Sequence, residues 1–182
     1  MTETDDTKGL VIIFTGNGKG KTTAALGMAL RAAGHGMKTC FIQFIKSSAM
    51  AYGELDGANM LQGSLEVIPL GKGFMNLGKE VEPTPEDIAL ARDTFQAALK
   101  KVISRDYDIV VLDEFTYMVN FGLLPVEEIL SLVDEKPKKL HLVITGRNAH
   151  PRLIERADLV TEMQESKHPF RDGIKAQRGV EF

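Results

Sequence analysis

The chain has 182 residues, with 22 basic and 25 acidic side chains and a formal net charge of −3. This length suits one domain with its own core, and the charge gives no overall basic field of the kind that nucleic-acid-binding proteins use. No apolar run approaches the length of a membrane span, and the acidic N-terminus is unlike a signal or transit peptide. The single cysteine, Cys40, cannot form an internal disulfide, so we expect a cytoplasmic protein with neither a nucleic-acid nor a membrane partner.

The N-terminal part of the chain predicts a strand, a glycine-rich turn and a helix in succession. Residues 1–8 are expected to form a disordered tail, followed by one domain over residues 9–182. The apolar run Leu10–Phe14 leads into Thr15-Gly16-Asn17-Gly18-Lys19-Gly20-Lys21-Thr22-Thr23, and a helical pattern runs from about Lys21 to Ala33. Such a turn directs backbone N–H groups at an anion beside the positive end of a helix.

This turn is close to the P-loop pattern but shifted at its start. The usual pattern has its first glycine where this chain has Thr15, and Gly16 comes one residue late. Lys21 would neutralise phosphate charge, and Thr22 would offer its hydroxyl to a magnesium ion. The alternative is a glycine-rich turn without a ligand.

The segment after the next strand is unusual for a compact domain. A strand is predicted over residues 38–44, apolar on both faces as in the centre of a parallel sheet. Residues 45–84 are rich in glycine and methionine, and only Leu65–Ile68 reads as a strand. So much irregular chain is seldom without a use, and we interpret it as a substrate-binding surface. A floppy surface insertion is the alternative.

The second strong motif follows a helix that begins at Thr84-Pro85 and ends near Ser104. Ile109–Leu112 is a buried strand, and Asp113 and Glu114 follow it in the Walker B pattern. Ligands of open α/β sheets bind at the carboxyl ends of the strands. Asp113 or Glu114 is therefore expected to hold magnesium, directly or through water.

The last third of the chain adds a helix that begins near Leu124, a buried strand over residues 140–145, a short helix from His150-Pro151 and a strand over residues 158–163. Arg147 follows the first of these strands at the ligand edge, where it either contacts phosphate or lies on the surface. The basic, glycine-punctuated segment 167–179 is either disordered or folded over the site.

Several motifs together resemble one family, the P-loop type ATP:corrinoid adenosyltransferases. The resemblance runs from Gly9 to Phe182, and that family shows the same shifted first glycine. The motifs are Gly16-Asn17-Gly18-Lys19-Gly20-Lys21-Thr22-Thr23, Gln43-Phe44-Ile45-Lys46, Gly71-Lys72-Gly73-Phe74, Val111-Leu112-Asp113-Glu114-Phe115-Thr116-Tyr117, Val143-Ile144-Thr145-Gly146-Arg147, Ala157-Asp158-Leu159-Val160-Thr161-Glu162-Met163, Lys167-His168-Pro169-Phe170 and Gly173-Ile174-Lys175-Ala176-Gln177.

The resemblance implies a fold, a reaction and partners. The fold is a single RecA-like three-layer α/β domain with a mostly parallel sheet, as a homodimer. The reaction transfers the 5′-deoxyadenosyl group of ATP to the Co(I) of a reduced corrinoid such as cob(I)alamin and releases triphosphate, in adenosylcobalamin synthesis or salvage. A flavoprotein reductant would supply the electron, and magnesium, or manganese in its place, would be the metal.

The resemblance also implies residue roles, carried over by motif position. Phosphate would be bound by Gly16, Asn17, Gly18, Lys19, Gly20, Lys21, Thr22 and Thr23, with Arg147 also on ATP. Lys21 and Glu114 would be catalytic; Thr22, Glu114 and Asp113 would hold the metal. Phe74 matches an aromatic that packs against the corrin and helps expel its lower axial ligand, with Met75 and Asn76 beside it.

The chain departs from the family at two places, and other functions stay open. Some members have tryptophan where this chain has Asn76, and some have an N-terminal helix over the corrinoid, whereas few residues precede Gly9 here. Because Co(I) attacks C5′ of ATP, no general base is needed, and no histidine–carboxylate pair stands out. The alternatives are a P-loop kinase or ATPase acting at the γ-phosphate, and a nucleotide-dependent corrinoid carrier without catalysis.

Overall fold

The computed structural model describes residues 8–47, 53–61, 63–71 and 82–181. Its elements in chain order are β1 (Val11–Thr15), α1 (Lys21–Ala33), β2 (Thr39–Ser47), α2 (Gly53–Met60), β3 (Leu65–Gly71), α3 (Pro85–Ile103), β4 (Ile109–Asp113), α4 (Tyr117–Asn120), α5 (Val126–Glu135), β5 (His141–Thr145), α6 (Pro151–Arg156), β6 (Leu159–Glu162) and the 3₁₀ helix η1 (Pro169–Asp172). No helix within these ranges combines the length and apolar character that crossing a membrane would require.

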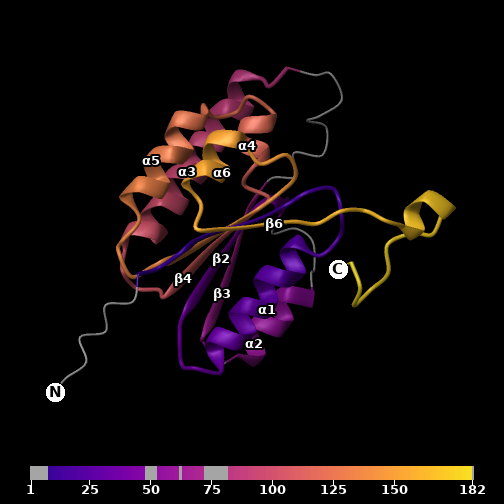
Figure 1. The fold of residues 1–182 in the computed structure, drawn as a ribbon, viewed down its shortest axis with the longest axis horizontal. Coiled ribbons are helices and arrows are strands. Elements are labelled where there is room, and N and C mark those ends of the chain that lie inside the picture. The colour runs from indigo at the N-terminus through magenta and orange to yellow at the C-terminus, as the bar shows by residue number, and fades with distance from the viewer. Residues whose placement is uncertain (1–7, 48–52, 62, 72–81, 182) are drawn as a thin grey trace.

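One sheet organises the chain. Its strand order is β3-β2-β4-β5-β1-β6, and every pairing between neighbours is parallel. Figure 1 shows α1 and α2 on one face and α3, α4, α5 and α6 on the other. The three-layer α/β fold expected from the sequence is confirmed. Because all strands run the same way, the segments that follow β1, β4 and β5 meet at one edge.

Alternating side chains fill the space on both faces of the sheet, as buried parallel strands require. Ile13, Ile42, Leu112 and Ile144 belong to the cluster beneath α3 and α5. Their strand neighbours Ile12, Phe41, Val111 and Val143 belong to the cluster beneath α1 and α2. The period of two places Gln43, Asp113 and Thr145, each two residues further along its strand, on the α1 side. Three adjacent strands therefore carry a row of polar side chains toward the phosphate-loop helix.

The helix predicted from Thr84 is confirmed in detail. α3 begins with a capping box, in which the Thr84 hydroxyl accepts from the Asp87 N–H while the Asp87 carboxylate accepts from the Thr84 N–H. This arrangement satisfies two backbone donors that the helix start would otherwise leave unpaired.

The prediction for residues 45–84 was partly wrong. The segment contains α2, and β3 continues to Gly71 instead of ending at Ile68. The residues of α2 carry little helical signal, because Gly57 in the middle of the helix costs about 1 kcal/mol relative to alanine. Tertiary contacts hold this helix instead: Ala58 is buried against the sheet and Glu54 forms an ion pair with Lys46. Residues 1–7 of the predicted tail, and Phe74, Met75 and Asn76, lie outside the described residues.

Candidate active site

A cavity of about 620 Å³ opens at the edge where β1, β4 and β5 end. The predicted residues that line it are Asn17, Gly18, Lys19, Gly20, Lys21, Thr22, Thr23, Glu114 and Arg147. Gly16 and Asp113 are not lining residues, but each bonds to one, since the Gly16 carbonyl accepts from Lys21 and the Asp113 carboxylate from Thr22. The structure thus gathers the phosphate-loop, Walker B and Arg147 predictions around one cavity.

The glycines of the loop are needed because the chain after β6 passes against it. Gly16 has φ 93°, and a Cβ there would lie 2.4 Å from the Met163 carbonyl oxygen. A Cβ on Gly18 would lie 2.7 Å from the Gln164 carbonyl oxygen. The Gly18 N–H donates to Met163 O at 2.7 Å. Side chains at these two positions would force the loop away from β6.

Thr15 fits the shifted start of the loop for a separate reason. It is the last residue of β1 and is buried, and its Oγ1 accepts a hydrogen bond from the Ala149 N–H at 3.1 Å. Its backbone carbonyl accepts from Met163 N at 2.8 Å. The residue therefore joins β1 to the segments after β5 and β6, which a glycine could do only through its backbone.

Lys21 lies at the centre of the loop. Its Nζ donates to the carbonyl oxygens of Gly16 and Gly18, both at 2.8 Å, and the residue is only 7% exposed. Burial lowers the pKa of this ammonium, while nearby Glu114 opposes that effect. The loop thus holds a buried positive charge beside the cavity, bonded to two of its own carbonyls, where it would attract an anion.

Lys19 connects the loop to the end of the chain. Its Nζ donates to the Val180 carbonyl at 2.7 Å. In Figure 1 the chain leaves β6, forms η1 away from the sheet and turns back toward the loop. His168, Gly179, Val180 and Glu181 line the cavity. Of segment 167–179, His168 and Gly179 line the cavity, whereas residues 169–178 between them are exposed.

The two Walker B acids have different surroundings. Asp113 is buried, and its Oδ1 accepts from Thr22 Oγ1 at 2.8 Å and from Thr145 Oγ1 at 2.7 Å. Glu114 follows with φ 61°, and its N–H donates to Thr145 Oγ1 at 2.9 Å. A left-handed conformation is costly for glutamate, so Thr145 holds both a carboxylate and a strained backbone in place.

Burial dominates the ionisation of both acids. Desolvation raises the pKa of Asp113, although the hydroxyls of Thr145 and Thr22 oppose the rise. Desolvation, with the nearby charge of Asp113, raises the pKa of Glu114 to about 7, and Lys21 and Arg147 oppose that shift. A carboxyl group in a cavity whose pKa lies near neutral pH is a common feature of functional sites.

The residues present fit a divalent cation. Within the described ranges, Asp113 Oδ2 and Glu114 Oε2 are buried without a hydrogen-bond partner, and oxygen atoms are the ligands that Mg²⁺ prefers. The same ranges contain no group of three or more His, Cys, Asp or Glu side chains that could hold a metal alone. A cation held here would therefore share its coordination with a bound phosphate, which is the usual arrangement for Mg²⁺.

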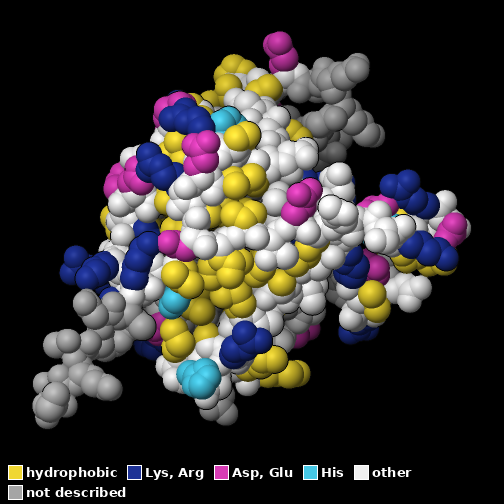
Figure 2. Space-filling model, in the orientation of Figure 1, with side chains coloured by type: hydrophobic (Ala, Val, Ile, Leu, Met, Phe, Trp, Pro, Cys, Tyr) yellow, Lys and Arg dark blue, Asp and Glu magenta, His cyan; other side chains and the backbone are white. Residues whose placement is uncertain are grey.

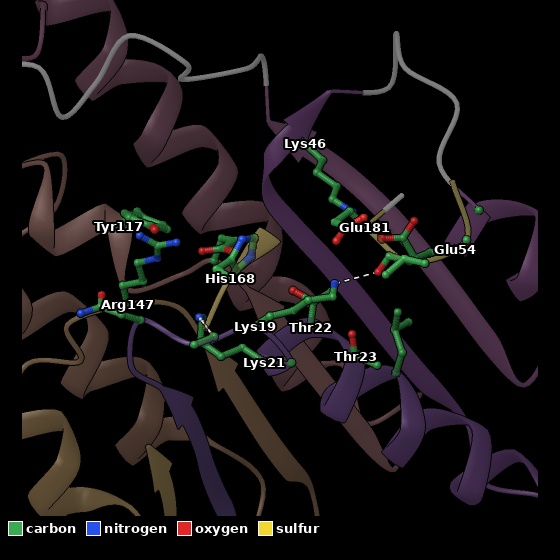
Figure 3. A pocket seen from close by; sticks show the side chains of 18 residues that line it. Lys19, Lys21, Thr22, Thr23, Lys46, Glu54, Tyr117, Arg147, His168 and Glu181 are labelled. Atoms are coloured by element: carbon green, nitrogen blue, oxygen red, sulfur yellow. Dashed lines mark hydrogen bonds and ion pairs between the residues drawn. The ribbon is translucent and has the colours of Figure 1, made fainter. Parts of the chain in front are cut away.

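The turn after β5 is locked against the segment after β4. Gly146 has φ 141°, and a Cβ there would lie 2.0 Å from Thr116 Oγ1. The Arg147 carbonyl accepts from Thr116 Oγ1 at 2.7 Å and from Asn120 Nδ2 at 2.8 Å. Figure 3 shows the Arg147 side chain at the same end of the pocket as Tyr117. The backbone of Arg147 is thus fixed while its guanidinium is presented to the cavity.

Sequence reasoning missed several lining residues. Tyr117 stacks on Phe121 with ring centroids 5.0 Å apart, and Lys46 forms an ion pair with Glu54 at the opposite end of the pocket from Tyr117 (Figure 3). His168 contributes from the C-terminal segment. Tyr117, Lys46 and His168 belong to motifs quoted above, but nothing in those motifs indicated which side chains would reach the cavity.

Comparison with known proteins gives a match over almost the whole chain. A family model described as ATP:corrinoid adenosyltransferase BtuR/CobO/CobP matches residues 7–182. A corrinoid adenosyltransferase from Sinorhizobium sp is 44% identical over 183 residues, which cover 100% of this chain and 83% of that protein. A corrinoid adenosyltransferase from Escherichia coli strain K12 is 39% identical over 183 residues, covering 100% of this chain and 90% of that protein.

A solved structure shares the fold at low sequence identity. The flagellar accessory protein FlaH from Methanocaldococcus jannaschii superposes with a TM-score of 0.56 and is 15% identical, covering 85% of this chain and 71% of that one. At this identity the likeness concerns the arrangement of the sheet and helices alone.

Proposed function

The chain belongs to the ATP:corrinoid adenosyltransferase family, and from this premise we propose how its residues divide the reaction. The enzyme transfers the 5′-deoxyadenosyl group of ATP to the Co(I) of a reduced corrinoid and releases triphosphate. The observation that carries the division of roles is the single cavity in which the phosphate loop, Glu114 and Arg147 meet.

The loop stabilises the leaving group. Co(I) is the nucleophile and attacks C5′ of ATP, so no proton has to be removed and negative charge develops on the departing triphosphate. Lys21, Lys19 and the loop N–H groups are placed to bind that charge, and Arg147 adds a planar guanidinium that can bind phosphate through two parallel hydrogen bonds. The remaining contribution is alignment of C5′ with the cobalt.

We assign the cation to Thr22 and the two Walker B acids. Thr22 and Glu114 line the cavity, and the Thr22 hydroxyl donates a hydrogen bond to the buried Asp113 carboxylate. Magnesium bound there would offset the charge of the triphosphate as the C5′–oxygen bond breaks. Manganese, which takes a similar set of oxygen ligands, would replace it.

The corrinoid is assigned to the segment after β3. Phe74, Met75 and Asn76 lie outside the described residues, but β3 ends at Gly71 on the same edge of the sheet as the cavity. Lys46 of β2 and Gly53 and Glu54 of α2 line one end of that cavity. A flat macrocycle laid over this end would bring its cobalt toward the nucleotide.

Replacing Phe74 separates lower-ligand displacement from adenosyl transfer. We expect Phe74→Ala to lose most turnover on cob(II)alamin with a protein reductant, by roughly tenfold or more on the scale of lost substrate positioning, yet to use chemically reduced cob(I)alamin almost normally. Met60→Ala is the control, since Met60 lies on the same part of the chain and is 79% exposed. Equal loss on both substrates would instead indicate a packing role for Phe74.

The products decide between the reaction classes. Incubation with chemically reduced cobalamin, ATP and magnesium should yield light-sensitive adenosylcobalamin and one triphosphate per cobalt alkylated. Release of ADP would indicate a kinase or ATPase. Binding of both substrates without a cobalt–carbon bond would indicate a carrier.

The assembly, the electron donor and the compartment are also proposals. Figure 2 shows hydrophobic side chains gathered over β6 and α6, where Ile154, Leu159 and Val160 are exposed. This uncovered edge supports a homodimer, since exposed apolar surface commonly marks an interface; a monomer in sedimentation equilibrium would contradict it. We further propose a flavoprotein reductant and a cytoplasmic location, and reduction assays with purified flavoproteins and cell fractionation test them.

A further inference from the structure

Buried polar atoms without partners gather at one place in the sheet. Within the described residues the side-chain atoms of this kind are Thr39 Oγ1, Gln43 Nε2, Gln43 Oε1, Asp113 Oδ2 and Glu114 Oε2. Thr39 begins β2, at the end of the sheet away from the cavity. All the others lie at the cavity end. Because unpaired buried groups are unfavourable and uncommon, such a cluster needs an explanation.

Gln43 is the least explained of these residues. It is 0% exposed, and neither end of its carboxamide has a hydrogen-bond partner. A carboxamide can donate two hydrogen bonds and accept two. Nothing in the fold requires a polar side chain here, since the neighbouring positions Phe41, Ile42 and Phe44 are apolar and fully buried.

The register of the sheet places Gln43 beside Asp113. In the parallel pair β2–β4, Gln43 is aligned with Asp113, and the pair before them is Ile42 with Leu112. Aligned residues of neighbouring strands point to the same face, and the Asp113 bond to Thr22 shows that this face looks toward α1. The two groups do not bond to each other, since Asp113 Oδ2 also lacks a partner. Each of them therefore has hydrogen-bonding capacity left for a further group.

The other side of Asp113 is already occupied. Its Oδ1 accepts from Thr22 and Thr145, so Oδ2 is the oxygen left for a further partner. Thr22, Asp113 and Glu114 are the residues assigned above to the cation. Magnesium retains several of its waters when it binds to proteins, and such waters need partners in the surrounding protein.

We propose that Gln43 is an outer contact of the cation site, hydrogen-bonding a water that the cation carries and thereby orienting that water and the Asp113 carboxylate. This inference rests on the proposed function, because it needs a cation at Thr22 and Glu114. Gln43 acts through water and is therefore a positioning residue. Its carboxamide has no hydrogen-bond partner within the protein, so the cost of burying it falls on the free protein and the stabilising contact forms in the complex.

The proposal predicts opposite effects of one substitution on two measurements. Gln43→Met keeps an unbranched side chain of similar length without polar atoms. The free protein should melt at the same temperature or higher, because a buried unpaired carboxamide is removed. The dissociation constant for Mn²⁺ in the ATP complex should rise about tenfold, the lower end of the range for lost outer-shell contacts. Electron paramagnetic resonance of protein-bound Mn²⁺, without corrinoid, measures this affinity apart from turnover.

Thr39→Val is the matched control. It removes another buried unpaired polar atom from the same strand, far from the cavity. It should leave Mn²⁺ affinity unchanged, with an equal or higher melting temperature. Wild-type Mn²⁺ affinity in Gln43→Met would overturn this inference but leave the assigned cation site intact. So would a lower melting temperature of the free variant, since that would show a permanently bound water. Failure of the wild-type protein itself to bind Mn²⁺ with ATP would overturn both the inference and the assigned cation site.

Discussion

Lys21→Ala should reduce adenosyl transfer by roughly 10²- to 10³-fold, the range found when one preorganised donor to a developing negative charge is removed. The Lys21 ammonium is buried at the centre of the phosphate loop and bonds to two of its carbonyls. Removing it leaves the triphosphate without a neutralising positive charge. It also removes two hydrogen bonds that stabilise the loop. Steady-state transfer to chemically reduced cobalamin gives the rate, and calorimetric titration with ATP gives the binding loss.

Two controls separate these effects. Lys136→Ala removes another partly buried lysine, whose Nζ donates to the carbonyls of Gly9, Pro137 and Leu140 at the other end of the sheet. It should destabilise the fold and leave ATP binding intact. Lys21→Arg keeps the charge but not the compact geometry, and should recover part of the binding. Near wild-type transfer in a folded Lys21→Ala protein would sink the phosphate assignment.

The fold was predictable where local sequence determines local structure. The strand, glycine turn and helix around Lys21 occur as expected, because glycine at positive φ and a lysine at the helix start act over a few residues. The Walker B strand was equally clear, since four apolar residues before two acids place the acids at a strand end. Both motifs then meet because parallel strands share one carboxyl edge.

Other parts depend on contacts far apart in the sequence. α2 carries too little helical pattern to be recognised and is held by Lys46 and the buried Ala58. Tyr117 and His168 reach the cavity only because α4 and the C-terminal segment fold onto it. Spacing along the chain contains no information about such approaches.

The row formed by Gln43, Asp113 and Thr145 shows the same limit more sharply. Each residue sits near the end of an ordinary apolar strand, and of the three only Asp113 stands out by type. Only the order β2-β4-β5 and the register of Gln43 with Asp113 make them neighbours. Strand order and register are decided by packing of the whole sheet, so the motif Gln43-Phe44-Ile45-Lys46 could be noticed in the sequence without its role being inferred.

Hydrogen bonds from Thr145 and Thr116 fix the backbone and side chains around Asp113 and Glu114, two carboxylates whose charge is unfavourable in the free protein. Thr145 bonds to Asp113 and to the backbone of Glu114, and Thr116 packs against the next turn. Burial raises the pKa values of both acids. These hydrogen bonds keep the two carboxylates in place although mutual repulsion and desolvation oppose it. Functional sites often reduce the stability of a protein in this way.

Glu114→Gln should therefore lower transfer and stabilise the cation-free protein. Transfer should fall by roughly 10²-fold or more, since a ligand that offsets leaving-group charge is lost. In the folded wild-type protein the Glu114 pKa is about 7, against an ordinary value of 4.5 for a solvated glutamate. The folded protein keeps this proton longer than the unfolded chain does. Stability is therefore lost as pH rises from 4.5 to 7 and stays lower above pH 7, by about 3 kcal/mol.

Melting curves in EDTA between about pH 4 and pH 8.5, a range that brackets both pKa values of Glu114, measure this difference. The wild-type and Glu114→Gln proteins should coincide at the acid end, and the variant should become progressively more stable up to pH 7. Glu86→Gln, at an exposed position in the first turn of α3, is the control and should change neither transfer nor the relative melting curve.

Curves that stay parallel at every pH would show that Glu114 ionises normally. Transfer close to that of wild type at saturating magnesium would show that the cation does not depend on Glu114. The melting curves, recorded without metal, report the ionisation of the carboxylate. The transfer assay, run with magnesium, reports its role as a ligand.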